Sequence, residues 1–196
     1  NFIRQISRYS TGLNYNYKDR YWRWCSFTEE KNVDDLLLNK PLYDDYFQLK
    51  NQYTSLVSAD NVNNVLYADL NLVLPYDMLH KVDMMSMAHG LEVRTPFLDH
   101  NIVAFANSLP QEFKIDNSMR KKIVQDTFRE FLPIELYNRP KHGFEVPLLK
   151  WFQNELKPFI EKQVIDTDFI ANQNIFNPKA IEHLKQQLFS ANPGEI

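Results

Sequence analysis

Apolar side chains recur at helical spacing along most of this chain, and the pattern predicts a mainly α protein. Between residues 64 and 74 they return every three or four positions, which indicates a helix that ends at Pro75. A second helix is predicted over Tyr76 to His89, with Gly90 as its left-handed C-terminal stop. Alternating apolar and polar runs, which are typical of strands, are scarce.

Cap and breaker residues predict the remaining helices. Asp99 is a good N-cap for a helix that closes at Pro110, and Ser118 is the expected cap of the next helix, which Pro133 terminates. The four methionines within residues 78–87 are expected in the core, where flexible side chains fill irregular gaps. The other expected helices are two short ones within 32–50 split at Pro41, one over 148–165 interrupted near Pro158, and one that opens with Asn177 as N-cap and Pro178 and runs through Phe189.

Composition indicates one globular domain and argues against several function classes. The chain has 196 residues, of which 44% are apolar, so it can bury a core. Its net charge of −3 argues against general nucleic-acid or anionic-membrane binding. Aromatic and basic residues alternate over 1–27, and packing of those rings on the core is favoured over base stacking. Cys25 is the single cysteine, so a reducing, cytoplasmic setting is expected.

Glycine is scarce, and this scarcity bears on nucleotide binding. The four glycines are Gly12, Gly90, Gly143 and Gly194, and they lie far apart. A phosphate-binding loop needs clustered glycines, because its backbone amides must close on the anion. If the protein uses ATP, its main phosphate loop is therefore expected outside these residues. The first residue is asparagine, which hints at a longer parent protein.

Two charged residues stand in an otherwise apolar turn between predicted helices. Glu92 and Arg94 lie two positions apart, shortly after Gly90. Two explanations stay open. Either the two side chains pair and hold the turn together, since charges removed from water are usually partnered, or one of them faces a ligand.

Basic residues cluster twice further along the chain. Arg120, Lys121 and Lys122 fall in the first turn of a predicted helix, where cations oppose the helix dipole. This indicates either an external anion or a solvated run of charge, and the pattern leaves both open. The loop 138–147 adds Lys141 between prolines, which suits a loop that holds side chains in place for a ligand. A second basic cluster strengthens the interpretation that these cations bind an external anion such as phosphate.

Two segments resemble the synthetase, or ATP-using, domain of the asparagine synthetase family. The first is KVDMMSMAHGLEVRTPFLDH at residues 81–100, and the second is SMRKKIVQDTFREFLPIELYNRPKHGFEVPLLKWF at residues 118–152. They stand in the family's order and at similar spacing, and the resemblance covers roughly residues 66–165. Several ordered segments form a stronger signal than one short motif.

The resemblance implies that residues 1–196 are a fragment, the helical C-terminal part of an α/β adenine-nucleotide-binding synthetase domain. The family's pyrophosphate loop and glutaminase domain would lie outside it. Family members make L-asparagine from L-aspartate and glutamine-derived ammonia through an aspartyl-adenylate, and they release AMP and pyrophosphate. ATP and Mg²⁺ are the implied cofactors, bound mainly outside this fragment. The implied enzyme is cytoplasmic and binds no nucleic acid or membrane. A homodimer is one of its possible oligomeric states.

Carried over by position, Glu92 resembles the family's active-site glutamate beside the adenylate. Lys121 and Lys141 resemble lysines that contact the departing pyrophosphate, where fixed cations stabilise the charge that gathers on the leaving group. Arg94 and Asp99 are expected to brace the turn. Two alternatives remain: a related enzyme that forms another amide or a β-lactam, and a helical interaction module without catalysis. The fragment by itself is expected to be inactive.

Overall fold

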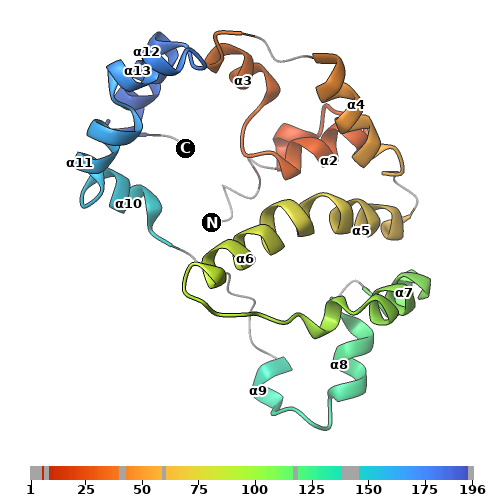
Figure 1. Ribbon diagram of the computed structural model, residues 1–196. Helices are drawn as coiled ribbons and strands as arrows, with labels where there is room; N and C mark the ends of the chain where they lie inside the picture. The colour runs from red at the N-terminus through yellow and green to blue at the C-terminus, as the bar shows by residue number, and fades with distance from the viewer. Residues whose placement is uncertain are drawn as a thin grey trace. The chain divides into compact units, whose positions relative to one another are not determined.

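The computed structural model describes residue 6 and residues 9–39, 43–58, 61–116, 119–137 and 146–193. Within these ranges the chain is mainly helical, and the only β pairing is two isolated antiparallel bridges, Leu37 with Phe176 and Ile115 with Arg120 (Figure 1). The prediction of a mainly α chain is therefore confirmed. No helix in the described ranges is long and apolar enough to cross a bilayer.

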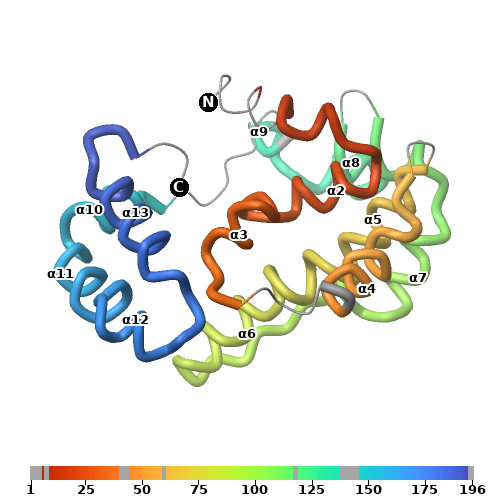
Figure 2. Tube along the Cα trace, turned by 90° about the horizontal axis from the view of Figure 1, so that it is seen from above, coloured from red at the N-terminus to blue at the C-terminus, as the bar shows by residue number. Residues whose placement is uncertain are grey.

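The helices fall into two compact units, which we describe separately (Figure 2). Unit 1 comprises Asn1–Cys25 and Gln48–Lys141, and unit 2 comprises Ser26–Phe47 and His142–Ile196. The elements of unit 1 are α2 (Tyr17–Cys25), the C-terminal part of α4 (Tyr43–Thr54), α5 (Val62–Asn71), the π-helical η1 (Leu74–Leu79), α6 (His80–Met87), the 3₁₀ turn η2 (Pro96–Leu98), α7 (His100–Ser108), the 3₁₀ turn η3 (Gln111–Phe113), α8 (Lys122–Phe128) and α9 (Ile134–Tyr137).

The core of unit 1 lies where α2 meets α5. Tyr21, Val57 and Ala68 are buried there. The Tyr21 hydroxyl donates a hydrogen bond to Asp69 Oδ1 at 2.9 Å. Burial, followed by this bond, raises the pKa of Tyr21 well above its usual range. The expected packing of at least this ring from the aromatic N-terminal stretch is confirmed, whereas Phe27 is fully exposed.

Helices α5 and α6 form one rod, and the prediction that Pro75 ends the first of them is wrong (Figure 1). Pro75 has no N–H to donate, so a regular α-helical ladder is interrupted at this point. The chain continues instead through the π-helical η1, whose last turn is closed by His80 N–H donating to the Pro75 carbonyl. The wider π turn lets the helix pass the proline without breaking.

Gly90 ends the rod as predicted. Its φ of 66° lies in the left-handed region. Gly90 N–H donates to Met87 C=O at 3.0 Å, and Leu91 N–H donates to Ser86 C=O at 2.9 Å. These two bonds form a Schellman motif, which satisfies the last carbonyls of the helix. The direction in which the chain leaves towards Glu92 is thereby set by backbone geometry.

We expect Gly90→Ala to lower the free energy of unfolding by about 1–2 kcal/mol, because an L side chain is strained at this φ. No atom lies within 4 Å of the added Cβ, so steric conflict contributes nothing to the loss. Gly90→Asn is the matched control, since asparagine tolerates the left-handed region better than alanine. Urea denaturation measures all three proteins, and an alanine variant as stable as the wild type would contradict this account.

The helices after this turn have caps and ends that agree only partly with those predicted from the sequence. Asp99 caps α7 as predicted, accepting a hydrogen bond from Asn101 N–H at 2.9 Å. Ser118 lies outside the described residues, and it is not the N-cap expected for α8. That helix begins only at Lys122, after the isolated bridge between Ile115 and Arg120. It also ends at Phe128, before the predicted apolar position Phe131.

The helix predicted over 148–165 in unit 2 is interrupted as expected, just before Pro158, whereas Pro41, the other predicted break, lies outside the described residues. Asn177 N–H donates to Leu36 C=O at 2.8 Å, and Leu38 N–H donates to Ile175 C=O at 2.9 Å. These bonds join the end of α3 (Glu30–Leu36) to the start of α13 (Pro178–Leu188). Asn177 also caps the last helix, as expected. The elements of this unit, beside the start of α4, are α3 (Glu30–Leu36), α10 (Leu148–Gln153), α11 (Lys157–Phe159, with Pro158), the π-helical η4 (Ile160–Val164), α12 (Thr167–Gln173) and α13 (Pro178–Leu188).

The expectation that the methionines pack in the core is wrong. Met78, Met84, Met85 and Met87 expose 46%, 52%, 62% and 57% of their surface. Among the described elements, α6 has its main contacts with η1, the segment that precedes it in the same rod. Few residues of the described chain are buried at all, and exposed apolar side chains are many.

Candidate functional site

The turn after α6 carries the first candidate group. Between Gly90 and Pro96 the chain has no regular structure, and Arg94 Nη2 lies 2.5 Å from Glu92 Oε1. The two side chains therefore form an ion pair, and whether Glu92 also faces a ligand stays a prediction. The side chains remain 70% and 83% exposed for Glu92 and Arg94, so the pair adds little to stability. A carboxylate that is held by one arginine and open to solvent is also accessible to a ligand.

The basic cluster near α8 divides into a paired and an unpaired part. Lys122 Nζ lies 2.8 Å from Asp126 Oδ2 and 3.7 Å from Asp116 Oδ2. The bond to Asp126 is the main reason that the pKa of Lys122 is raised. Arg120 and Lys121 have no carboxylate partner among the residues that the structure describes. Two of the three cations are thus available to an anion.

This arrangement corrects the argument from the helix dipole. Only Lys122 lies on α8, and Arg120 and Lys121 precede that helix. Opposition to the dipole therefore does not explain the cluster. The available charge comes from the turn that leads into the helix.

Lys121 has an unusual backbone conformation for its type. Its φ of 56° and ψ of 40° place it in the left-handed region, where a lysine is uncommon. That conformation costs about 1–2 kcal/mol for an L residue. Strained residues persist where the surrounding structure enforces them, and they cluster at binding sites. The strain falls on the lysine that the family resemblance assigns to an anion.

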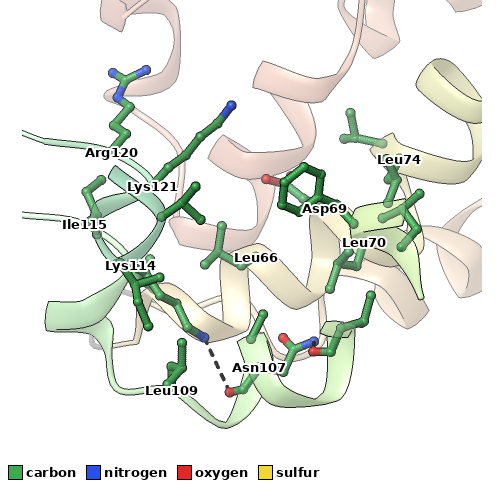
Figure 3. Close-up of a pocket in the computed structure, with 18 of the residues that line it drawn as sticks. Leu66, Asp69, Leu70, Leu74, Asn107, Leu109, Lys114, Ile115, Arg120 and Lys121 are labelled. Atoms are coloured by element: carbon green, nitrogen blue, oxygen red, sulfur yellow. Dashed lines mark hydrogen bonds between the residues drawn. The ribbon is translucent and has the colours of Figure 1, made fainter. Parts of the chain in front are cut away.

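An apolar pocket of about 650 Å³ lies beside these cations, within unit 1 (Figure 3). Its walls come from α5, η1, η2, α7 and α8. Arg120, Lys121, Lys114, Asp69 and Asn107 are the polar residues that contribute to its lining. The apolar lining consists of Val62, Leu66, Leu70, Val73, Leu74, Met78, Phe97, Leu98, Val103, Ala106, Leu109, Ile115, Ile123 and Val124.

The structure does not bring every predicted site residue together. Lys121 lines the pocket and Glu92 does not, although Phe97 and Leu98 from the same turn region do. Lys141 lies outside the described residues, so its position relative to Glu92 and Lys121 stays a prediction. In the part of the chain that the structure describes, no three histidine, cysteine or acidic side chains gather as a metal site.

Two polar residues of the pocket were missed by sequence reasoning. Asp69 lies on the helical face that carries Leu66 and Leu70, and a carboxylate on an apolar stripe was a detectable signal. Lys114 stands between Phe113 and Ile115 and gave a weaker signal of the same kind. Both are charged residues in apolar surroundings, where a partner is normally required.

Comparisons with known proteins agree with the motifs in these elements. The family model described as asparagine synthase matches residues 5–194. Asparagine synthetase [glutamine-hydrolyzing] 1 of Bacillus subtilis is 33% identical over 111 residues, which cover 57% of this chain and 18% of that protein. A putative asparagine synthetase [glutamine-hydrolyzing] of Mycobacterium tuberculosis is 35% identical over 101 residues, covering 52% of this chain and 16% of that protein.

Asparagine synthetase [glutamine-hydrolyzing] of Homo sapiens is 37% identical over 98 residues, covering 46% of this chain and 17% of that protein. In each case the matched segment spans less than a fifth of the relative's length. No solved structure matches the chain significantly.

Proposed function

The chain belongs to the asparagine synthase family, and from this we propose that it is the helical part of an ATP-dependent amidotransferase. In this proposal the parent protein makes L-asparagine from L-aspartate and glutamine-derived ammonia. An aspartyl-adenylate is the intermediate, and AMP and pyrophosphate are released. The α/β part with the pyrophosphate loop, and the glutaminase domain, belong to the rest of the parent. The names of the relatives support this substrate class.

The exposed Glu92 carboxylate is the observation that carries the proposal. Its turn is fixed on one side by the Schellman motif at Gly90 and on the other by the Asp99 cap of α7. Arg94 holds the carboxylate from one side only, which leaves an oxygen lone pair open. A carboxylate positioned in this way can orient ammonia, or accept a proton from it, as ammonia attacks an acyl carbon.

Lys121 and Lys141 would act on the leaving group. As the bond to the α-phosphorus breaks, negative charge gathers on pyrophosphate, and fixed cations lower the energy of that state. Arg120 and Lys121 lie beside the pocket and have no carboxylate partner among the described residues, which supports a phosphate-binding role here. Mg²⁺, when bound, would neutralise phosphate oxygens, and its ligands are proposed to lie in the rest of the parent.

Pyrophosphate release from MgATP tests the proposal in the intact parent protein. The assay supplies ammonia and compares aspartate with a panel of other carboxylic acids. Aspartate-dependent release, with asparagine formed in equal amount, is the expected result. Release with a different acid would reassign the substrate, and no release with any acid would overturn the enzymatic proposal in favour of a helical interaction module.

A further inference from the structure

The side chain of Lys114 joins the segment before α8 to two other helices of unit 1. Lys114 is half-buried, and its Nζ donates to Asn63 Oδ1 at 2.6 Å and to the Asn107 C=O at 3.4 Å. Asn63 lies in the first turn of α5, and Asn107 lies in the last turn of α7. A helix C-terminus favours a cation, because its last carbonyls lack partners within the helix. One ammonium group therefore fixes this segment to the ends of two helices.

The main chain of Lys114 holds the peptide that follows Lys121. Lys122 N–H donates to the Lys114 C=O at 3.1 Å. Lys122 is the first residue of α8, so its N–H has no acceptor within the helix and needs one from outside. This N–H belongs to the peptide that joins Lys121 to Lys122. The bond to Lys114 therefore sets the ψ angle of Lys121.

The peptide that precedes Lys121 is held from the other side. Gln125 Nε2 donates to the Arg120 C=O at 2.6 Å, and this carbonyl belongs to the peptide that joins Arg120 to Lys121. Both peptides that flank Lys121 are thus hydrogen-bonded to residues outside them. These bonds account for the left-handed φ of 56° and ψ of 40°, since a strained conformation persists only where its surroundings impose it.

The direction of the side chains separates Lys114 from its neighbours. Figure 3 shows Arg120 and Lys121 extending away from the apolar lining, whereas Lys114 turns back to Asn107. The geometry points to Lys114 as a positioning residue, whose ammonium anchors the carbonyl that sets the backbone of Lys121 and thereby directs the Lys121 side chain. Lys114 itself contacts no substrate. This inference rests on the role of Lys121 at pyrophosphate proposed above.

Steady-state kinetics of the intact parent protein test the effect on catalysis. Lys114→Met keeps the length of the side chain and removes its ammonium. It should lower kcat for pyrophosphate release from MgATP by about 10²-fold, because a displacement of about 1 Å in a catalytic group can have that effect. The KM for aspartate should stay within about twofold, since Lys121 is proposed to act on the leaving group. Lys114→Arg keeps a charged donor and should retain most of the activity.

A double-mutant cycle distinguishes positioning from a general effect on the fold. Lys121→Ala removes the group through which Lys114 is proposed to act, and alanine is strained at this φ as lysine is. Adding Lys114→Met to Lys121→Ala should therefore change kcat by no more than about twofold, whereas independent effects would multiply. Lys157→Met is the matched control, because Lys157 is also half-buried and its Nζ contacts the Phe189 ring in unit 2. It should leave kcat near the wild-type value.

Amide hydrogen exchange measures the positioning without any reaction. The Lys122 N–H is protected by its bond to the Lys114 carbonyl. Exchange at Lys122 should become at least about fivefold faster in Lys114→Met and stay unchanged in Lys157→Met. If Lys114→Met does not fold, as judged by circular dichroism, Asn63→Ala replaces it, since this variant removes the shorter bond of Lys114 and keeps its charge. Asn63→Ala should change kcat and exchange in the same directions by smaller factors.

Failure of this inference and failure of the proposed function give different results. A wild-type parent that releases no pyrophosphate with any acid would remove the proposed function, and faster exchange at Lys122 would still support the positioning of the Lys121 backbone. In an active parent, a wild-type kcat in Lys114→Met would overturn the inference. A loss that multiplies in full with that of Lys121→Ala would also overturn it, as would unchanged exchange at Lys122. Lys114 would then join α5 to α7 without directing Lys121.

Discussion

Replacing Lys141 with alanine in the intact parent protein should nearly abolish asparagine synthesis and leave glutamine hydrolysis largely unchanged. The proposed role of this lysine is to stabilise charge on departing pyrophosphate, and the loss of one such donor lowers kcat on the order of 10²–10³-fold. Glutamine hydrolysis would be catalysed by a separate domain, so it does not depend on that charge. Parallel assays of asparagine and glutamate formation measure the two activities.

Lys179→Ala is the control for the Lys141 variant, because it removes an equally long cation from the exposed face of α13. It should leave both activities near wild type. Lys141→Arg keeps the charge and should retain more synthesis than Lys141→Ala. If Lys141→Ala lost both activities equally, folding would be the cause, and if it lost neither, the lysine would not contact the leaving group.

Glu92→Gln should reduce synthesis by about 10²–10⁴-fold, the range expected when a positioned acid–base group is removed. The substitution keeps the shape of the side chain and removes the negative charge. Because the side chain is 70% exposed and its ion pair contributes little to folding, the free energy of unfolding should change by less than about 0.5 kcal/mol. Steady-state rates and urea denaturation of the same preparation give both quantities.

Arg94→Gln distinguishes a catalytic role of Glu92 from a structural role of its ion pair in the turn. It breaks the same ion pair from the other side, so a purely structural role predicts similar losses in the two variants. A catalytic Glu92 predicts that Arg94→Gln retains most of the synthesis that Glu92→Gln loses. Equal losses in the two variants would show that the pair only shapes the turn.

The features that sequence reasoning predicted well are those whose chemistry is local. Gly90, Asp99 and Asn177 each act on backbone groups within a few residues, and all three behave in the structure as their types predict. The ion pair between Glu92 and Arg94 is local in the same sense. Short-range bonds of this kind depend little on what the rest of the fold does.

The features that sequence reasoning missed depend on contacts between distant segments. Residue type alone does not place Lys121 in the left-handed region, and the bridge between Ile115 and Arg120 that precedes it is not visible in the sequence pattern. Lys114 meets Asn63 across 51 positions. Met85 has an apolar side chain, and no described element covers it. Such outcomes are decided by tertiary packing, which overrides local preference.

The π-helical η1 bears on how the length of this chain can vary in evolution. His80 bonds to Pro75, five residues back, whereas an α-helical turn spans four. A π turn therefore accommodates one extra residue while the helix on either side keeps its faces. Deleting Pro75 should remove both the extra residue and the missing N–H and so leave a regular helix, but a deletion in α6 would rotate the following chain by about 100° and carry Glu92 with it. Single-residue insertions and deletions among family members should therefore collect in η1 and be absent from α6.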